Sequence, residues 1–422
     1  MTTLKLEDYH FDASSCVRCS NCKFIEHIWM KSARFGKQCP INVRYAFNLY
    51  SAAGLLHAAS AVLEKNLEFT PKLLDALFQC TSCGACDVRC KRNSDLEVLG
   101  VIEGLKVRAV EEGKEPPKHK ILADTVSKSK NIYGSPNENR RKWRTKEIKP
   151  AQKAEVLYFV GCRASFKDAE IAKATAKILS DTGTPFMVQD DEWCCGHAQF
   201  ATGQWQTARE EAEHNLQAIE SSGAKIIITS CAECYKTLKV DYPRILGKST
   251  EDMSYGVLHI TEYIDQLITG GNYKFKKNVP MKVTYHDPCN LGRLGEPWFH
   301  WEGEHKKFGV LEPPKTFRRG DKGIYQPPRD ILNSIPGIEL VEMERTRDNS
   351  WCCGAGAGVD VAFKDFALWT AETRIEEAES TGAEAIVSCC PACKDILGRA
   401  VKATNTKIRV YDISEIMLKA LS

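Results

Sequence analysis

Glu192-Trp-Cys-Cys-Gly196 recurs in the same chain as Ser350-Trp-Cys-Cys-Gly354, and this repeated pair of adjacent cysteines decides the fold. A long amphipathic segment follows each pair, at residues 207–222 and 363–381. Each segment is predicted to be a helix, and each runs into a Gly-Ala pair that suits a helix C-terminus. The chain therefore contains an internal duplication. The glycine after each cysteine pair is expected to let the backbone approach a bound group closely.

Strand-like segments flank the repeated motif in both copies. Residues 156–162 and 283–289 are short apolar runs that end at a cysteine, and residues 225–231 and 384–390 each lead into Cys-x-x-Cys. Strands that alternate with helices predict a mostly parallel sheet. We therefore expect two small α/β units whose cysteines lie where strands end, which is the usual location of functional groups in such folds.

The part of the chain ahead of the duplication is predicted to be helical. Residues 44–64, 71–78 and 96–112 have apolar side chains on a helical period and separate two cysteine-rich loops. Residues 113–153, rich in Lys, Pro, Asn and Ser, are expected to be a linker or a segment that wraps over a neighbouring domain. The expected architecture is a multidomain α+β chain with four parts: a ferredoxin-like domain at 1–112, the connecting segment at 113–153, a first α/β unit at 154–272, and a second at 273–422 with an inserted loop at 292–325.

Composition excludes several classes of protein. The 422 residues are 43% apolar and 27% charged, as in a soluble globular protein. The 58 basic and 55 acidic residues leave a net charge of +3, which gives no indication of nucleic-acid binding. No apolar run approaches the roughly 18 residues of a membrane helix, and no signal sequence is visible at Met1. We expect a cytoplasmic protein that reaches a membrane only through a partner.

The nineteen cysteines indicate metal ligation, because structural disulfides are rare in the cytoplasm. Two loops have the three-residue spacing of ferredoxins, and in two-cluster ferredoxins the fourth ligand of each loop serves the other cluster. Zinc ribbons are the main alternative. The sequence departs from the ferredoxin pattern in two places. Sixteen residues separate Cys22 from Cys39, which predicts a surface excursion, and Lys91 stands where a proline is usual. The crossed spacing predicts two cubane [4Fe–4S] clusters, one on Cys16, Cys19, Cys22 and Cys90, and one on Cys80, Cys83, Cys86 and Cys39.

Each copy of the duplication has five further cysteines in matching order, more than one cube or one zinc ion requires. This doubled pattern behind a ferredoxin segment resembles the CCG-domain iron–sulfur proteins, and among them the D-subunit family of heterodisulfide reductase. The resemblance implies a noncubane [4Fe–4S] cluster in each copy, and a disulfide cleaved between the two clusters while the ferredoxin clusters supply electrons. The implied ligands are Cys162, Cys194, Cys195, Cys231 and Cys234 in the first copy, and Cys289, Cys352, Cys353, Cys390 and Cys393 in the second.

Other residues near these motifs have more than one interpretation. Cys389 aligns with Ser230 and is interpreted as a small buried side chain, with an alternative ligand or redox thiol as the other interpretation. His286 is the polar residue most expected to act at the site. Arg163 and Arg293 either bind an anionic substrate, lower the negative charge of a cluster, or are structurally paired. The 292–325 loop, with Trp298, Trp301, His300 and His305, is a lid, a docking surface or a surface insertion.

Two functions remain open at this stage. The first is an oxidoreductase subunit that reduces or forms a disulfide through the noncubane clusters. The second is an electron-relay subunit of a large anaerobic complex, for example one that accompanies benzoyl-coenzyme A reductase. Both imply redox partners, which are expected to contain flavin or cytochrome or to resemble hydrogenase, formate dehydrogenase or a ring-reductase complex. Complete cysteine sets favour the first function, and a zinc scaffold is the remaining alternative.

Overall fold

The computed structural model describes residues 4–296, 301, 303–315 and 318–421. The part ahead of residue 113 consists of helices and turns, as predicted. Thr70 caps α4 because its hydroxyl accepts a hydrogen bond from the Leu73 amide, and Pro71 occupies the first helical position, where no amide donor is needed. The helices are α1 (His10–Ser14), α2 (Pro40–Tyr45), α3 (Ala52–Leu63), α4 (Pro71–Phe78), α5 (Ala85–Asn93) and α6 (Val98–Glu111), with the short turns η1 (Leu6–Tyr9), η2 (Asn21–Lys23) and η3 (His27–Trp29).

The helix predicted over residues 44–64 is wrong in its first third. The chain leaves α2 at Ala46, whose φ of 49° is left-handed, and helix α3 begins only after its N-cap, Ser51. The intervening loop packs tightly on Gly54, where a Cβ atom would lie 2.1 Å from the Asn48 carbonyl oxygen. Helical periodicity alone cannot detect a break of this kind, because the alanines and leucines continue through it.

The connecting segment between the cysteine-rich helices and the duplication lies against both copies. It contains α7 (Pro117–Ser129) and the turn η4 (Asn137–Arg141), and it buries His119, Val126 and Trp143. The Lys130 carbonyl accepts the amide of Cys194 in the first copy, and His119 Nε2 lies 3.0 Å from the Gly358 carbonyl oxygen in the second. Residues 113–153 therefore pack over the two copies through their own helix.

The two copies have the same sheet topology. The strand orders are β2-β1-β3-β4 and, read from the opposite edge, β8-β5-β9-β10, and every pair is parallel. The predicted parallel α/β duplication is confirmed. The first copy has β1 (Val156–Phe159), α8 (Cys162–Phe166), α9 (Ala169–Asp181), β2 (Phe186–Met187), α10 (His197–Ala201), α11 (Trp205–Ser222), β3 (Ile226–Thr229), α12 (Ala232–Lys236), the π-turn η5 (Thr237–Asp241), α13 (Tyr242–Leu246), β4 (Gly256–His259) and α14 (Ile260–Thr269).

The second copy repeats this plan with an insertion after its first strand. The register also matches, since β1 pairs with β3 from Val156↔Ile226 and β5 pairs with β9 from Val283↔Ala385. Its elements are β5 (Met281–Tyr285), β6 (Glu304–His305), η6 (Lys307–Gly309), β7 (Leu311–Glu312), α15 (Gln326–Ser334), β8 (Ile338–Val341), η7 (Arg347–Asn349), α16 (Val359–Ala362), α17 (Lys364–Glu379), β9 (Ala385–Ser388), α18 (Pro391–Thr404), β10 (Arg409–Asp412) and α19 (Ile413–Lys419).

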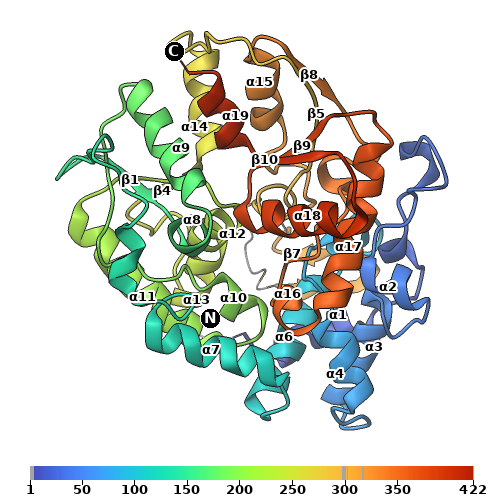
Figure 1. Cartoon of the computed structure of the whole chain (residues 1–422). Coiled ribbons are helices and arrows are strands. Elements are labelled where there is room, and N and C mark those ends of the chain that lie inside the picture. Colours follow the sequence, from blue (N-terminus) through green and yellow to red (C-terminus); the bar gives the residue numbers. More distant parts are fainter. Residues whose placement is uncertain (1–3, 297–300, 302, 316–317, 422) are drawn as a thin grey trace.

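Reciprocal helix contacts join the copies. The last helix of the first copy, α14, packs on α15, and the last helix of the second copy, α19, packs on α9 (Figure 1). Lys394 strengthens this contact because its ammonium group pairs with both Asp168 at 2.6 Å and Glu415 at 2.9 Å. These contacts hold the two copies together.

The inserted loop anchors the helical part to the second copy. Lys315 pairs with Asp95 and Glu97 at 3.3 and 3.0 Å, and Arg318 pairs with buried Asp87 of α5 at 3.4 Å. On the other side of α5, Arg92 pairs with Asp348 of η7 at 2.7 Å. Trp298 and His300 lie outside the described residues. The described part of the loop contacts α5, the helix that carries the predicted ligands Cys86 and Cys90.

Candidate metal centres

The first four-cysteine set lies near the surface of the helical part. Cys16 and Cys19 occupy the loop that leads into η2, Cys22 lies within η2, and Cys90 lies on α5. Burial raises the pKa of the Cys90 thiol to about 12, and Cys16 and Cys19 interact with it electrostatically. Cys22 interacts with the same two thiols. The structure therefore groups Cys90 with the first loop rather than with the second loop beside which it stands in the sequence.

The second four-cysteine set lines one small cavity between α2 and α5, formed by Cys39, Cys80, Cys83 and Cys86. Cys39 is the N-cap of α2, and Pro40 begins that helix. Burial raises the pKa of the Cys39 and Cys86 thiols well above the usual value. Such thiols ionise only when a cation compensates their charge, so metal binding here is coupled to proton release.

The first five-cysteine set is a continuous series of side-chain contacts. Cys162 at the start of α8 contacts Cys194, and Cys194 contacts its neighbour Cys195, just ahead of α10. Cys195 contacts Cys234 of α12, which in turn contacts Cys231 at the N-cap of that helix. All five side chains are buried. The close approach extends to the backbone, since a Cβ atom at Gly161 would lie 2.9 Å from the Cys234 sulfur.

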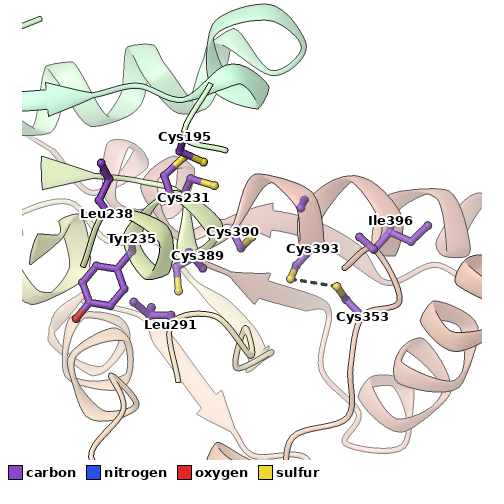
Figure 2. Close-up of a cluster of buried hydrophobic side chains, with 14 of the residues drawn as sticks. Cys195, Cys231, Tyr235, Leu238, Leu291, Cys353, Cys389, Cys390, Cys393 and Ile396 are labelled. Carbon is purple, nitrogen blue, oxygen red and sulfur yellow. Dashed lines mark hydrogen bonds between the residues drawn. The ribbon is translucent and has the colours of Figure 1, made fainter. Parts of the chain in front are cut away.

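The second five-cysteine set repeats the series in the same order. Cys289, after β5, contacts Cys352, and Cys352 contacts Cys353. The Sγ atoms of Cys353 and Cys393 are 3.3 Å apart, and Cys393 contacts Cys390 (Figure 2). The fold thus gathers ten cysteines into two equivalent groups of five, although the members of one group lie up to about a hundred residues apart in the sequence. Their ligation of iron stays a prediction.

Two contacts connect the sets. Cys231 of the first five-cysteine set contacts Cys390 of the second, and Figure 2 shows these side chains as neighbours where the two copies meet. Cys83 of the second four-cysteine set contacts Cys352. A third, electrostatic interaction links Cys22 of the first four-cysteine set to Cys39 and Cys86 of the second. The four sets therefore lie in order, from the first four-cysteine set through the second, then to the second copy and finally to the first copy.

Two buried cations beside the cysteine sets indicate that the cysteines carry negative charge as thiolates. Arg293 is 1% exposed, and its guanidinium donates to the carbonyl oxygens of Cys83, Asp348 and Ser350 at 2.7–2.9 Å. Lys106 is fully buried and donates to the carbonyl oxygens of Cys80 and Ala201 and to the Ser82 hydroxyl. Within the described part of the chain, neither cation forms an ion pair with a carboxylate. A buried charge is costly unless it is compensated, and ligating thiolates would supply the compensation.

Arg140 provides a third cation beside a predicted ligand. Its guanidinium lies 3.6 Å from the Cys162 sulfur and pairs at 2.7 Å with Glu192, which also accepts hydrogen bonds from the Val160 and Gly161 amides. Sequence reasoning missed Arg140, Glu192 and Lys106. Arg140 stands in a basic, weakly patterned segment, and Glu192 aligns with Ser350 in the other copy, so neither has a visible signal.

His286 lies beside the second five-cysteine set with a defined protonation state. Its Nδ1 atom accepts a hydrogen bond from Arg374 Nε at 3.1 Å, and burial lowers its pKa to about 3, with a further contribution from Arg374. The ring is therefore neutral, and its hydrogen is on Nε2, since arginine can only donate. Nε2 has no hydrogen-bond partner among the described residues, and the ring lies in one group with the sulfurs of Cys353 and Cys393.

The remaining polar neighbours are largely paired. Asp287 accepts two hydrogen bonds from Arg329, at 2.7 and 3.0 Å, and is held in the core. His197 is buried, its pKa is lowered to about 3 by burial, and its Nδ1 lies 3.2 Å from the Thr237 hydroxyl. Arg163 pairs at 3.7 Å with Glu233 and at 3.4 Å with Asp360 of the second copy. These pairs indicate a structural role for Asp287 and favour structural pairing for Arg163, which joins the two copies.

A cavity of about 180 Å³ opens onto the first five-cysteine set. All five cysteines of that set contribute to its lining, together with Arg163, Lys167 and Glu233, and the second copy contributes Ala355, Ala357, Gly358, Asp360, Val361, Asp395 and Arg399. Apolar side chains of α7 and the segment that follows it complete the walls. The five cysteines of the second set do not line this cavity, and neither does the described part of loop 292–325. This cavity therefore gives access to the first five-cysteine set.

The glycines after the cysteine pairs serve helix packing. A Cβ atom at Gly354 would lie 2.4 Å from the Ala367 carbonyl oxygen in α17, and one at Gly196 would lie 3.0 Å from Glu211 Oε2 of α11. Both residues have positive φ, 98° and 86°. The space that a Cβ atom would need at these two glycines is filled by the following long helix, and the expectation that they let the backbone approach a bound group stays a prediction.

Cys389 lies away from the sulfur series and forms a polar contact of its own. It is fully buried, and its sulfur lies 2.8 Å from the Tyr285 hydroxyl. The corresponding pair in the first copy is Tyr158 and Ser230, with their hydroxyls 3.0 Å apart. Burial raises the pKa of the Cys389 thiol well above its usual value, so it is a neutral hydrogen-bonding group.

Two parallel cysteine-rich units joined to a helical dicluster segment define one component of an iron–sulfur oxidoreductase. The 4Fe-4S dicluster domain family matches residues 12–94, and the cysteine-rich CCG domain family matches residues 156–239 and 316–398. The chain is 32% identical, over 97% of its length and 94% of the relative, to the D subunit of the dihydromethanophenazine:CoB--CoM heterodisulfide reductase of Methanosarcina acetivorans. The chain belongs to this D-subunit family of heterodisulfide reductase.

More distant relatives are longer proteins. The chain is 30% identical to the B subunit of the fumarate reductase (CoM/CoB) of Methanothermobacter marburgensis, with 82% of the chain matching 62% of that protein. It is 24% identical to EtfAB:quinone oxidoreductase of Syntrophomonas wolfei, with 97% of the chain matching 58% of that protein. The predicted assignment as an iron–sulfur electron-transfer subunit that acts within a complex is confirmed at this level. In the described part of the chain, no helix has the length and apolar character needed to cross a bilayer.

Proposed function

We propose that the chain reduces or forms a disulfide in the cavity beside the first five-cysteine set, as one subunit of a larger oxidoreductase. The single observation that carries this proposal is the spatial order of the four sulfur sets, which starts at the surface and ends at that cavity. We assign a cubane [4Fe–4S] cluster to each four-cysteine set and a noncubane [4Fe–4S] cluster to each five-cysteine set. When bound, these clusters would supply one-electron carriers and, in the five-cysteine sets, iron able to accept a sulfur atom.

The protein's own residues prepare the cavity for such a reaction. Leu122, Ile132 and Val361 form apolar walls that exclude water from the first five-cysteine set. Arg140 stabilises negative charge at Cys162, and Arg293 does the same where the second four-cysteine set meets the second copy. His286, with its Nε2–H directed to no other described group, is assigned as a hydrogen-bond donor to the sulfurs of Cys353 and Cys393. Hydrogen bonds of this kind raise the potential of an iron–sulfur site.

The proposed reaction consumes two electrons and two protons and releases two thiols from one disulfide. A redox partner that carries flavin or cytochrome would supply the electrons, and any membrane contact would be made through that partner. The predicted boundaries, with the ferredoxin-like domain at 1–112, the connecting segment at 113–153, and the two CCG domains at 154–272 and 273–422, are proposed as the functional units of this protein.

A relay without a small substrate is the second candidate, and ion pairs at the cavity favour it. Lys167 pairs with Asp395 at 2.8 Å, and Arg163 pairs with Asp360, so both pairs join the two copies across the cavity. Such bridges would restrict the entrance if they persisted in solution. In that case the clusters would pass electrons onward to a partner.

The test is to fill the cavity without touching a ligand. Val361→Trp places a large side chain in the cavity wall, and Val310→Trp, at an exposed position of the inserted loop, is the matched control. Both proteins are reconstituted anaerobically and reduced with viologen. We expect Val361→Trp to retain iron and reduction of its clusters while it loses thiol release and the thiol-dependent paramagnetic signal seen with a dialkyl disulfide. If the unsubstituted protein reduces none of a range of disulfides and shows no such signal, the relay function is correct instead.

A further inference from the structure

The segment that carries Cys19 exposes several large apolar side chains. Cys19 is the one thiol among the nineteen that is exposed rather than buried or half-buried. The most exposed large apolar side chains of residues 15–48 are Ile28 at 82%, Val17 at 75%, Phe47 at 61% and Trp29 at 60%. Groups of exposed apolar side chains of this size are uncommon on proteins that work alone and mark interaction sites.

The same segment concentrates positive charge. Residues 15–48 contain six lysines and arginines and a single acidic residue, Glu26, whereas the whole chain has 58 basic and 55 acidic residues. Lys31 and Lys37 are exposed at the edge of the apolar group. Arg34 is also exposed there, although it pairs with Glu376. Residues 113–153 are also basic, with twelve lysines and arginines against four acidic residues, so residues 15–48 are one of two positive segments in a chain of net charge +3.

The excursion between Cys22 and Cys39 holds these side chains in place. Phe24 and Lys37 form an antiparallel bridge, and Ile25 and Phe35 are buried beneath it. The second copy fixes the far side, because Glu344 accepts hydrogen bonds from the Ser32 amide and hydroxyl at 2.9–3.0 Å. The exposed residues Ile28 and Trp29 therefore lie on a supported loop rather than on a free chain.

We propose that this surface, termed the Cys19 face (Val17, Ile28, Trp29, Lys31, Lys37 and Phe47), docks an acidic electron-transfer protein whose own cofactor lies near its surface. The proposal rests on the assignment of a cluster to the first four-cysteine set. One electron leaves the reduced cofactor of the partner and reduces that cluster, so the partner is oxidised by one electron. An apolar centre supplies contact area, and the surrounding lysines attract the acidic partner at long range.

A protein partner explains the face better than a lipid surface does. The first four-cysteine set stands at the outer end of the spatial order of sulfur sets, and its Cys19 is exposed on the same segment as the apolar side chains. A lipid surface would bury the same side chains but would neither donate nor accept an electron at that position. Binding to anionic vesicles is therefore the competing outcome of the test.

The experiment uses the full-length, anaerobically reconstituted protein and two reductants. Reduction of its clusters is followed by stopped-flow absorbance with a reduced acidic [2Fe–2S] ferredoxin and, separately, with reduced methyl viologen, a small cation. The charge variant is Lys31→Glu with Lys37→Glu, and the matched control is Lys276→Glu with Lys277→Glu, two exposed lysines close to the C-terminal helix. The apolar variant is Ile28→Ser with Trp29→Ser.

We expect the charge variant to be reduced by ferredoxin at least about tenfold more slowly at low salt, with a difference that shrinks as salt is added. The apolar variant should require a higher ferredoxin concentration for half-maximal rate, and neither variant should be reduced more slowly by viologen. Equal ferredoxin rates for the charge variant and the Lys276/Lys277 control would overturn the proposal. A second result would also overturn it: the unsubstituted protein binds phosphatidylserine vesicles, and the apolar variant loses this binding but is still reduced by ferredoxin at the unsubstituted rate. Failure of viologen to reduce any cluster would instead contradict the cluster assignment.

Discussion

At the scale of single residues, buried cations beside the sulfur sets compensate the negative charge that ligating thiolates would carry. Arg293 and Lys106 use all their described hydrogen bonds on neutral acceptors, so their charge is available to the nearby cysteines. Lys106 has no signal in the sequence, whereas Arg293 is among the residues that the sequence places beside a cluster. The proximity of Arg293 to Cys289 is visible in the chain, but its contact with the Cys83 carbonyl joins positions 210 residues apart.

Removing the charge of Arg293 tests this role. Arg293→Met should lower the reduction potentials of the clusters on the second four-cysteine set and on the second five-cysteine set, because the reduced, more negative forms lose a nearby cation. An interaction of roughly 2 kcal/mol in a partly screened interior corresponds to about 100 mV for a one-electron couple. Redox titration monitored by paramagnetic resonance measures the shift.

Arg293→Lys is the control because it keeps the charge and loses part of the hydrogen bonding. Its potentials should stay close to those of the unsubstituted protein even if its thermal stability falls. Equal potentials in the Met and Lys variants would show that Arg293 only fixes the backbone.

Cys389 should be replaceable, because the first copy already shows the alternative. Cys389→Ser reproduces the Tyr158–Ser230 contact at Tyr285 and leaves the five-cysteine series intact. We expect unchanged iron and sulfide content and a change in unfolding free energy of less than about 1 kcal/mol. Cys390→Ser, one position further on, should lower the iron content. Loss of iron from Cys389→Ser would identify Cys389 as a ligand.

At the scale of elements, each pair of adjacent cysteines is held by the long helix that follows it. Gly354→Ala should destabilise the second copy by more than about 3 kcal/mol, since the added methyl group meets the Ala367 carbonyl of α17 at 2.4 Å and the positive φ adds strain. Gly382→Ala is the matched control, because Gly382 also has positive φ, 70°, but a Cβ atom there would meet nothing within 4 Å. It should lose only about 1 kcal/mol. Equal losses in chemical denaturation would show that backbone strain alone, without the contact to α17, explains the glycine.

Element boundaries were predictable where local chemistry sets them. Pro71 and Thr70 define the start of α4, and the strand-to-cysteine runs of both copies appear as parallel strands in the expected order. The break between α2 and α3 was not predictable, because the tight packing of Asn48 on Gly54 is a tertiary contact within an alanine-rich stretch. Helix α7 was missed for the related reason that it buries few side chains, and its apolar positions face two different copies.

At the scale of the whole molecule, the duplication, the ferredoxin-like helices and the inserted loop form one assembly around the sulfur sets (Figure 1). The sequence spacing indicated which cysteines belong together, since each set follows from a motif or from the repeat. It could not indicate that Cys83 meets Cys352, that Cys231 meets Cys390, or that residues of both copies line a cavity beside the first five-cysteine set. These features depend on how α9, α14, α15 and α19 pack across the two copies, which no local pattern records.

The most direct measurement is the identity and position of the metal in the sulfur sets. Crystals of the anaerobically reconstituted protein, measured on both sides of the iron and zinc absorption edges, would show which element lies at each set. We expect iron at all four sets, with about four iron atoms in each. Zinc at either five-cysteine set, or sulfur atoms there with no metal between them, would contradict the assignment of a redox cluster to each copy.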